Sequence, residues 1–211
     1  MPAPEDFHHL EPLAAAALAG YFLGALPFGY LVAKSRGIDI FKEGSGSSGA
    51  TNVRRLLGAR AGNTVFVLDA LKGALAAGWP LYFAFEPKLL GFIGLIFAMF
   101  GHSFSCFAGF RGGKGVATGF GVFLAASPWA ALAALGVFAV VLALTRYVSL
   151  GSIVASIAFM VFAWFFPPGP RPPAFYAVEC IVALLIVIKH RTNIRRLMGG
   201  TESRFGAKKH T

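Results

Sequence analysis

Apolar runs alternate along the chain with short polar and glycine-rich stretches. The seven apolar runs occupy 13–33, 64–85, 89–107, 116–126, 129–144, 149–166 and 174–188. A helix needs roughly 20 apolar residues to cross a bilayer, so this pattern predicts a chain of membrane-spanning helices. The fourth run stands apart, because at a rise of about 1.5 Å per residue it would cross only about half of the hydrocarbon core.

The dipeptide Ser127-Pro128 leaves two topologies to compare. It could kink one long helix, which gives six spans, or turn the chain between two short helices, which gives seven. Seven spans with the N-terminus outside place sixteen Lys and Arg in the cytoplasm and two outside, whereas six spans divide them nine to nine. Because cytoplasmic loops are enriched in Lys and Arg, we expect seven spans, with a short fourth helix and a cytoplasmic C-terminus.

Composition supports an all-α integral membrane protein with one domain over 1–211. Hydrophobic residues make up 56% of the chain and charged residues 13%, and the mean hydropathy is +0.68. Soluble domains carry about 25% charged residues. The net charge of +10 would suggest nucleic-acid binding in a soluble protein, but here the basic residues flank apolar runs, so topology explains them and no nucleic-acid partner is expected.

The two ends of the chain are expected to be short tails on opposite sides of the membrane. Residues 1–12 are acidic and lack the positive start of a cleavable signal, so we expect an extracytoplasmic tail and an uncleaved first span. Residues 203–211 form a short basic tail in the cytoplasm.

Three polar stretches fall on the cytoplasmic side of this topology: GSGSSGATNVRR at 44–55, GHSFSCFAGFRGGKGVATG at 101–119 and KHRTNIRRLMGGTE at 189–202. In the first, glycines can turn backbone N–H groups inward around an anion, and serines and arginines add donors suited to phosphate. The alternative is a flexible linker whose basic residues contact lipid phosphates.

The second and third stretches carry further candidates. The glycines around Lys114 suit a phosphate at a helix start, although a re-entrant turn with a snorkelling lysine gives the same pattern. This is not a Walker A loop. His190 and Asn193 are expected on one face of the seventh helix, where a histidine can equally be an interfacial residue. Asp69 and Lys72, three apart in the second run, are expected to form an ion pair. The histidine spacing predicts no metal site.

Together, the residues resemble a known family. GSGxxGATN, GHxFxxFxxFxGGKGVAT and KHRxNIxRLxxGxE, in this order and spacing, are similar to the bacterial acyl-phosphate:glycerol-3-phosphate acyltransferases. The resemblance extends to FVLDALKG at 66–73 and RYVSLGSI at 146–153, and it covers nearly the whole chain. Two positions depart from it, since Ser47 stands where the family usually has Asn, and Ser105 where it usually has Pro.

The resemblance implies transfer of a fatty acyl group from acyl phosphate to the sn-1 hydroxyl of glycerol 3-phosphate, without a covalent acyl-enzyme, cofactor or metal. It implies an enzyme of the bacterial cytoplasmic membrane that contacts lipids and is expected to be a monomer. The implied catalytic residues are Ser45, His190 and Asn193. The implied phosphate-binding residues are Ser45, Gly46, Ser47, Arg55, Gly112, Gly113, Lys114 and Gly115, and the implied supporting residues are Asn52, His102 and Glu202.

Two questions stay open at the level of sequence. The base that removes the hydroxyl proton is either His190 or a substrate phosphate oxygen, because no carboxylate pairs with His190 in an obvious relay. The alternative function is a transporter of glycerol 3-phosphate or a related organic phosphate. A transporter usually shows internal symmetry and charges on several spans, and neither is evident.

Overall fold

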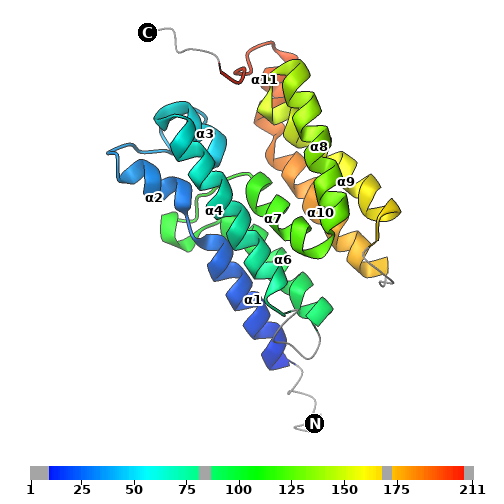
Figure 1. Ribbon diagram of the computed structural model, residues 1–211. Helices are drawn as coiled ribbons and strands as arrows, with labels where there is room; N and C mark the ends of the chain where they lie inside the picture. Colours follow the sequence, from blue (N-terminus) through cyan, green and yellow to red (C-terminus); the bar gives the residue numbers. More distant parts are fainter. Residues whose placement is uncertain (1–9, 81–86, 168–172, 207–211) are drawn as a thin grey trace. The chain divides into compact units, whose positions relative to one another are not determined.

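The computed structural model describes residues 10–80, 87–167 and 173–206, and in these ranges the chain is helical apart from connecting loops (Figure 1). The helices form two compact units, Met1–Ala126 and Ser127–Thr211, which are described one at a time. Most of the expected extracytoplasmic tail, residues 1–9, lies outside the described residues, as do residues 207–211 of the expected basic tail. The single domain over 1–211 stays a prediction.

The first unit contains six α-helices and one 3₁₀ turn in the described residues: α1 (Leu10–Ala25), α2 (Phe28–Lys34), α3 (Ala50–Leu57), α4 (Ala59–Gly78), α6 (Pro87–Ser103), η2 (Cys106–Ala108) and α7 (Val116–Ala126). The first apolar run is therefore not one continuous helix, because it breaks at Leu26-Pro27. Proline has no N–H to donate to the preceding turn, so the break at this dipeptide has a direct covalent cause.

Small residues let the helices of the first unit approach closely. Helix α1 packs against α4 and α6, and α4 packs against α7. A Cβ added at Gly24 of α1 would overlap the backbone of Ala98 in α6, and one added at Gly121 of α7 would overlap Ala70 in α4. In a membrane, where lipid tails are as apolar as side chains, such close backbone packing is what holds helices together.

The second unit contains α8 (Pro128–Thr145), α9 (Val148–Phe165), α10 (Pro173–Lys189) and α11 (Arg191–Met198). Ser127 has a non-helical backbone (φ −145°, ψ 69°) and Pro128 is the first residue of α8. Ser127-Pro128 therefore separates two helices, and α7 has the bounds that the apolar pattern predicts, residues 116–126.

One expectation for the second unit is wrong. His190 and Asn193 do not share the face of one helix, because α10 ends at Lys189 and α11 begins at Arg191 after a bend of 51°. The N–H of His190 donates to the carbonyl of Val187, a bond across three residues that tightens and ends the last turn of α10. His190 lies at the junction, and Asn193 is the buried residue of α11.

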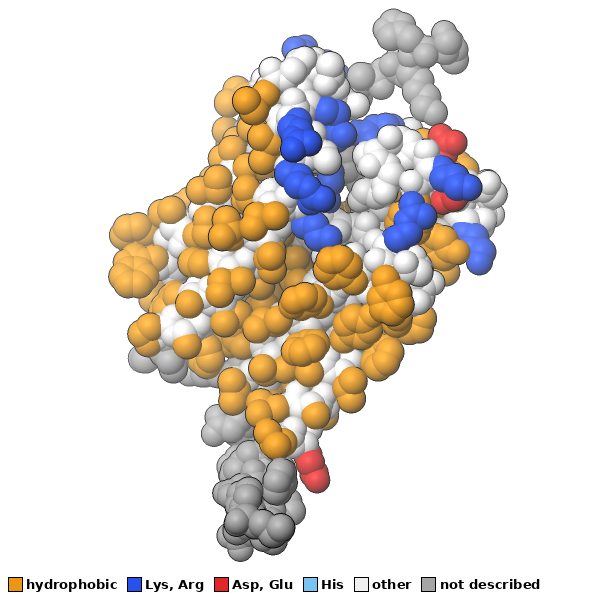
Figure 2. Space-filling model, turned by 180° about the vertical axis from the view of Figure 1, so that it is seen from behind, with side chains coloured by type: hydrophobic (Ala, Val, Ile, Leu, Met, Phe, Trp, Pro, Cys, Tyr) orange, Lys and Arg blue, Asp and Glu red, His pale blue; other side chains and the backbone are white. Residues whose placement is uncertain are grey.

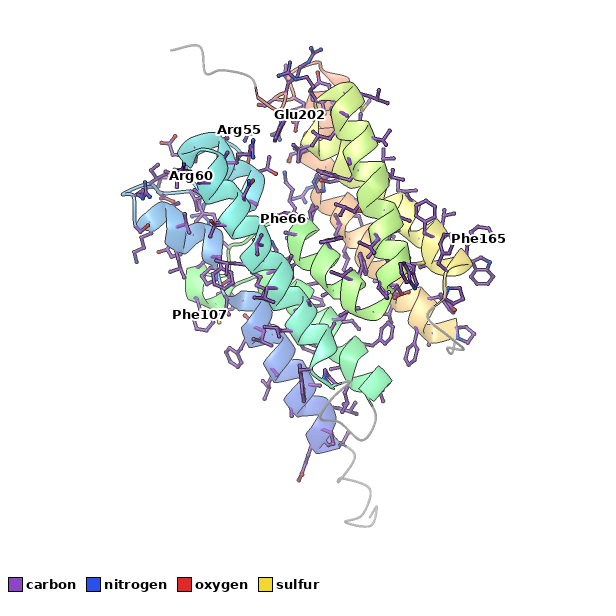
Figure 3. All side chains as sticks on the ribbon, in the orientation of Figure 1. Arg55, Arg60, Phe66, Phe107, Phe165 and Glu202 are labelled. Carbon is purple, nitrogen blue, oxygen red and sulfur yellow. The ribbon has the colours of Figure 1, made fainter. Side chains whose placement is uncertain are left out.

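The exterior of both units is apolar over broad areas. Figure 2 shows that hydrophobic side chains cover much of the visible face and that Lys and Arg side chains gather apart from them. Phe66, Phe107 and Phe165, labelled in Figure 3, are 37%, 54% and 68% exposed. Three described segments are long and apolar enough to cross a membrane: Leu10–Lys34, Pro128–Thr145 and Val148–Phe165. The bent pair α10–α11 passes the same criterion as a unit. A count of seven spans stays a prediction.

Candidate active site

Asn52 holds the first glycine-rich loop in a fixed shape. Its side chain is buried in the first turn of α3, where Oδ1 accepts hydrogen bonds from the N–H of Ser45 (2.9 Å) and from Nη1 of Arg55 (3.2 Å). Its Nδ2 donates toward three main-chain carbonyls, those of Ile40, Glu43 and Ser47, at 3.0–3.3 Å. A flexible linker has no such buried anchor, so the loop at 44–52 is an ordered structure.

The loop residues expected to bind phosphate are placed by this anchor. Ser45 and Ser47 are half-buried, and Gly46 has a left-handed backbone (φ 66°) that Cβ-bearing residues rarely adopt. Arg55 projects from α3 (Figure 3) and shares the Asn52 oxygen with Ser45. The side chain of Ser47, which departs from the family pattern, makes a long hydrogen bond, in which its Oγ accepts from the N–H of Gly49 at 3.4 Å.

The second loop wraps around His102, a buried residue of α6. The N–H of Gly113 donates to the carbonyl of His102 (3.2 Å), and a Cβ added at Gly112 or Gly113 would overlap the main chain or the ring of that histidine. The ring Nδ1 lies 3.0 Å from Oγ1 of Thr118, at the start of α7. Lys114 and Gly115 follow at the entry to α7, and Gly115 is left-handed (φ 82°). Glycine is therefore required here by space as well as by backbone angle.

The first and second loops meet at one pocket of the first unit. Its walls include Ser48, Lys72, His102, Ser105, Arg111 and Gly112. Arg111 of the second loop contacts the segment just before the first loop, since its Nη2 donates to the carbonyl of Phe41 (3.3 Å) and its guanidinium lies 4.2 Å from the centre of the Phe41 ring.

The broken first span forms another wall of this pocket. The expected ion pair is confirmed, with Lys72 Nζ 2.7 Å from Oδ1 of Asp69, and both side chains are 3% exposed. The same Nζ donates to the carbonyl of Leu26 (2.7 Å), and Ser105 Oγ donates to the carbonyl of Ala25 (2.5 Å). Lys72 and Ser105 thus satisfy carbonyls at the end of α1 that lose their helical partners at Pro27. Proline at position 105 could not make this bond.

In the second unit, Glu202 has the role that Asn52 has in the first. Its Oε1 accepts from Ser149 Oγ and Asn193 Nδ2, both at 2.7 Å, and its Oε2 accepts from Arg196 Nε at 2.7 Å. Partial burial raises the pKa of the Glu202 carboxyl, but the bonds from Arg196, Ser149 and Asn193 and the Arg196 charge outweigh it, so the pKa lies below its ordinary value. Figure 3 shows Glu202 just beyond α11.

His190 is buried at the junction of α10 and α11, with Nδ1 2.7 Å from the carbonyl of Ile186. A carbonyl can only accept a hydrogen bond, so Nδ1 carries the proton, and in the neutral ring Nε2 has the lone pair. In the described residues no group of three or more His, Cys, Asp and Glu side chains is arranged to hold a metal ion.

Sequence reasoning missed several contacts within these clusters. Ser149, Arg196 and Thr118 touch expected site residues, but none of the three was predicted as part of the site. Ser48, one of the serines expected to add donors in the first stretch, lines the pocket. RYVSLGSI, which contains Ser149, was the available signal for the second unit. The expected residues of the first two stretches fall in the first unit, and His190, Asn193 and Glu202 fall in the second.

Similar sequences were found along nearly the entire chain. The family model of glycerol-3-phosphate acyltransferase matches residues 14–200. A glycerol-3-phosphate acyltransferase of Geobacter sulfurreducens is 42% identical over 198 residues, covering 94% of this chain and 100% of that protein. One from Geobacillus kaustophilus is 46% identical over 192 residues, covering 90% of this chain and 94% of the relative.

Solved structures agree with these sequence matches. The crystal structure of PlsY (YgiH), an integral membrane glycerol 3-phosphate acyltransferase in its glycerol 3-phosphate form, is 38% identical and gives a TM-score of 0.86. The alignment covers 92% of this chain and 96% of that one. From the matched family model, the identity of these relatives and the shared helical fold, we conclude that this chain belongs to the glycerol-3-phosphate acyltransferase family.

Proposed function

We propose that this protein transfers a fatty acyl group from acyl phosphate to the sn-1 hydroxyl of glycerol 3-phosphate, giving lysophosphatidic acid and inorganic phosphate. Family membership supports the acyltransferase activity, and the glycerol 3-phosphate and lysophosphatidic acid forms of the related crystal structures support acceptor and product. The observation that carries the proposal is the ordered pair of glycine loops around one pocket, because both substrates are phosphorylated.

The reaction depends on positioning the two substrates rather than on a covalent enzyme intermediate. The acceptor hydroxyl attacks the carbonyl carbon of the acyl phosphate, a new ester C–O bond forms, and the bond between the carbonyl carbon and the phosphate oxygen breaks. Phosphate is the leaving group, so the donor is already activated and no acyl-enzyme is required. The protein must hold two anionic groups close together and aim one hydroxyl, which preorganised donors do well.

In this proposal the first unit binds phosphate. Ser45, Gly46 and Arg55 offer donors from the loop that Asn52 shapes. Lys114 adds positive charge between Gly113 and Gly115, in the loop that His102 supports. Arginine and lysine supply the counter-charge that phosphoryl groups require, so the proposal includes no metal or other cofactor.

His190 and Asn193 are the residues proposed to orient the acceptor hydroxyl. The Ile186 carbonyl fixes Nδ1 of His190, and Nε2 of the same ring accepts a hydrogen bond from the attacking hydroxyl. Asn193, three residues further along the chain, is held in place by its hydrogen bond to Glu202. A main-chain carbonyl fixes the tautomer but, unlike a carboxylate, has no charge to stabilise an imidazolium. The hydroxyl proton is therefore transferred to a phosphate oxygen of the substrate.

We place the reaction at the cytoplasmic face of the bacterial inner membrane. The support is the distribution of Lys and Arg, which favours seven spans with the N-terminus outside. With that topology all three glycine-rich stretches lie at the depth of the cytoplasmic headgroups. The acyl chain then stays among lipid tails, and the protein acts as a monomer surrounded by lipid.

The test is a donor comparison with purified protein in lipid nanodiscs. Acyl phosphate should release inorganic phosphate only when glycerol 3-phosphate is present, with equimolar lysophosphatidic acid, while acyl-CoA should give no product. Product from acyl-CoA alone would reject the proposed donor but keep the acyltransferase. No product from any donor, by protein that binds glycerol 3-phosphate and carries it into vesicles, would indicate a transporter instead.

A further inference from the structure

Arg146, between α8 and α9, has a backbone conformation that its side-chain type disfavours. It is left-handed (φ 62°, ψ 16°), and Phe110 is the other residue besides glycine with positive φ in the described ranges. Glycine would occupy this position without a Cβ penalty. The presence of arginine therefore suggests that its side chain does something at this turn.

The side chain of Arg146 binds the end of the chain. Its Nε and Nη2 donate to the carbonyl of Phe205 at 3.2 and 2.9 Å, and the N–H of Phe205 donates to the carbonyl of Arg146 at 2.6 Å. Next to this pair, the Arg204 guanidinium lies 5.6 Å from the centre of the Tyr147 ring, and its Nε donates to the Tyr147 hydroxyl at 3.3 Å. Arg204 and Phe205 thus bind Tyr147 and Arg146, the two residues of the α8–α9 turn.

These contacts make residues 201–205 a strap between two anchors. At its beginning, the N–H of Thr201 donates to the carbonyl of Arg196 at the end of α11 (2.8 Å). At its end, Phe205 is clamped by Arg146. Between the anchors lies Glu202, whose carboxylate binds Ser149 at the start of α9 and Asn193 on α11.

We infer that Arg146 is a positioning residue for acyl transfer, which clamps the strap so that Glu202 holds Asn193 in place. A guanidinium that donates two hydrogen bonds to one carbonyl fixes both the distance and the direction of that carbonyl, here the one of Phe205. Without the side-chain clamp, the segment after Glu202 keeps the Arg204 contacts and the main-chain bond from the N–H of Phe205, but the Phe205 carbonyl loses both guanidinium donors and the Glu202 carboxylate is held less firmly. The inference rests on the proposed role of Asn193 in orienting the acceptor.

The test compares Arg146→Gly with Arg195→Gln. Glycine suits the left-handed turn and removes only the side-chain clamp, whereas the control removes one positive charge from an exposed position of α11. In nanodiscs, Arg146→Gly should lower kcat about tenfold or more, since small misplacements of positioning groups have effects of that size, and change KM for acyl phosphate less than about twofold. Hydrogen exchange should rise over 193–205 in Arg146→Gly alone.

Truncation gives a second, independent variant. A chain ending at Gly206 keeps the strap contacts that the structure describes and should match the wild type, whereas one ending at Arg204 lacks both the carbonyl and the N–H of Phe205 and should lower kcat and raise exchange at least as much as Arg146→Gly. Combining Arg146→Gly with Glu202→Gln should lower kcat no further than the more damaging single change, because both changes act on one support.

Several results would overturn the inference. A wild-type kcat in Arg146→Gly would do so, as would a lowered kcat with unchanged exchange over 193–205, or additive effects in the double variant. If Arg146→Gly fails to fold, the Arg204 truncation decides alone. A wild-type protein with no acyl transfer would reject the proposed function, while the exchange measurements would still show whether Arg146 holds the strap.

Discussion

At the scale of single residues, two buried amide and carboxylate side chains organise the candidate site. Asn52 binds five main-chain or side-chain groups in and next to the first loop, and Glu202 binds three side chains on α9 and α11. The sequence predicted both as supporting residues through a family resemblance. It could not predict their partners, since most of the Asn52 contacts are to backbone carbonyls whose positions exist only once the loop has folded.

Removing the Asn52 side chain should disorder the first loop. In Asn52→Ala, the N–H of Ser45 and three carbonyls lose their partner, and each buried group left unsatisfied costs about 1–3 kcal/mol. We expect acyl transfer to fall by about 100-fold, as measured by phosphate release. Asn63→Ala is the matched control, because Asn63 makes an exposed bond to Arg54. Equal activity of the two variants would contradict the anchoring role.

Lys114 and Ser45 should affect different kinetic constants. Lys114→Ala removes a positive charge from the second loop and should raise KM for glycerol 3-phosphate about tenfold or more with a smaller change in kcat. Ser45→Ala should mainly lower kcat. Steady-state kinetics with each substrate varied in turn separates the two effects, and an unchanged KM for both substrates in Lys114→Ala would reject its role in binding.

The lowered pKa of Glu202 predicts a pH dependence with a definite sign. A carboxyl that is more acidic when folded adds stability above its ordinary pKa, near 4.5, and that stability is lost as the pH falls through the lowered value. The difference in unfolding temperature between wild type and Glu202→Gln should therefore be full above about pH 5 and shrink below about 4.5. Thermal scans between pH 3 and 6 would measure it, and a difference that grows with acidity would be contrary evidence.

At the scale of elements, sequence pattern predicted helices better than their ends and breaks. The 116–126 run has the bounds of α7, and the Ser127-Pro128 break was foreseen. The break at Leu26-Pro27 was not predicted, although proline was the signal, because the apolar pattern continues through it. His190 and Asn193 were wrongly placed on one helix, since periodicity alone does not reveal where a helix bends.

The second loop should not tolerate a methyl group at Gly113. That methyl would overlap the ring of His102, which is buried and held beside Thr118, so the loop must move. Gly113→Ala should lower acyl transfer at least about tenfold, while Gly136→Ala in α8, where a Cβ meets nothing within 4 Å, should stay near wild type. Parallel activity and unfolding measurements of the two variants make the comparison. Comparable activity would indicate that the loop can shift without loss.

At the scale of the whole molecule, the composition and charge pattern identified a membrane protein, and the family resemblance was confirmed by the matched relatives. The number of spans does not follow from helix length and composition alone. Several helices are shorter than a bilayer is thick, including α7, and their placement in a membrane depends on neighbouring helices rather than on their own length.

Seven spans predict that the two ends of the chain lie on opposite sides of the membrane. A reporter that is active only outside the cytoplasm should work when fused before residue 1 and fail when fused after residue 211. A cytoplasmic reporter should give the reverse pattern, which serves as the control. Both ends on one side would require an even number of spans and would reject the proposed topology.

The Asp69–Lys72 pair also bears on how the protein enters the membrane during synthesis. A single charged residue at the centre of a helix costs about 2.5–3.5 kcal/mol at the insertion machinery. In α4, Lys72 has its countercharge three residues away, and its Nζ also donates to the carbonyl of Leu26, in a segment that leaves the ribosome earlier. We therefore expect the first apolar segment to be in the bilayer already as a hydrogen-bond acceptor for Lys72, so that α4 inserts against it rather than alone.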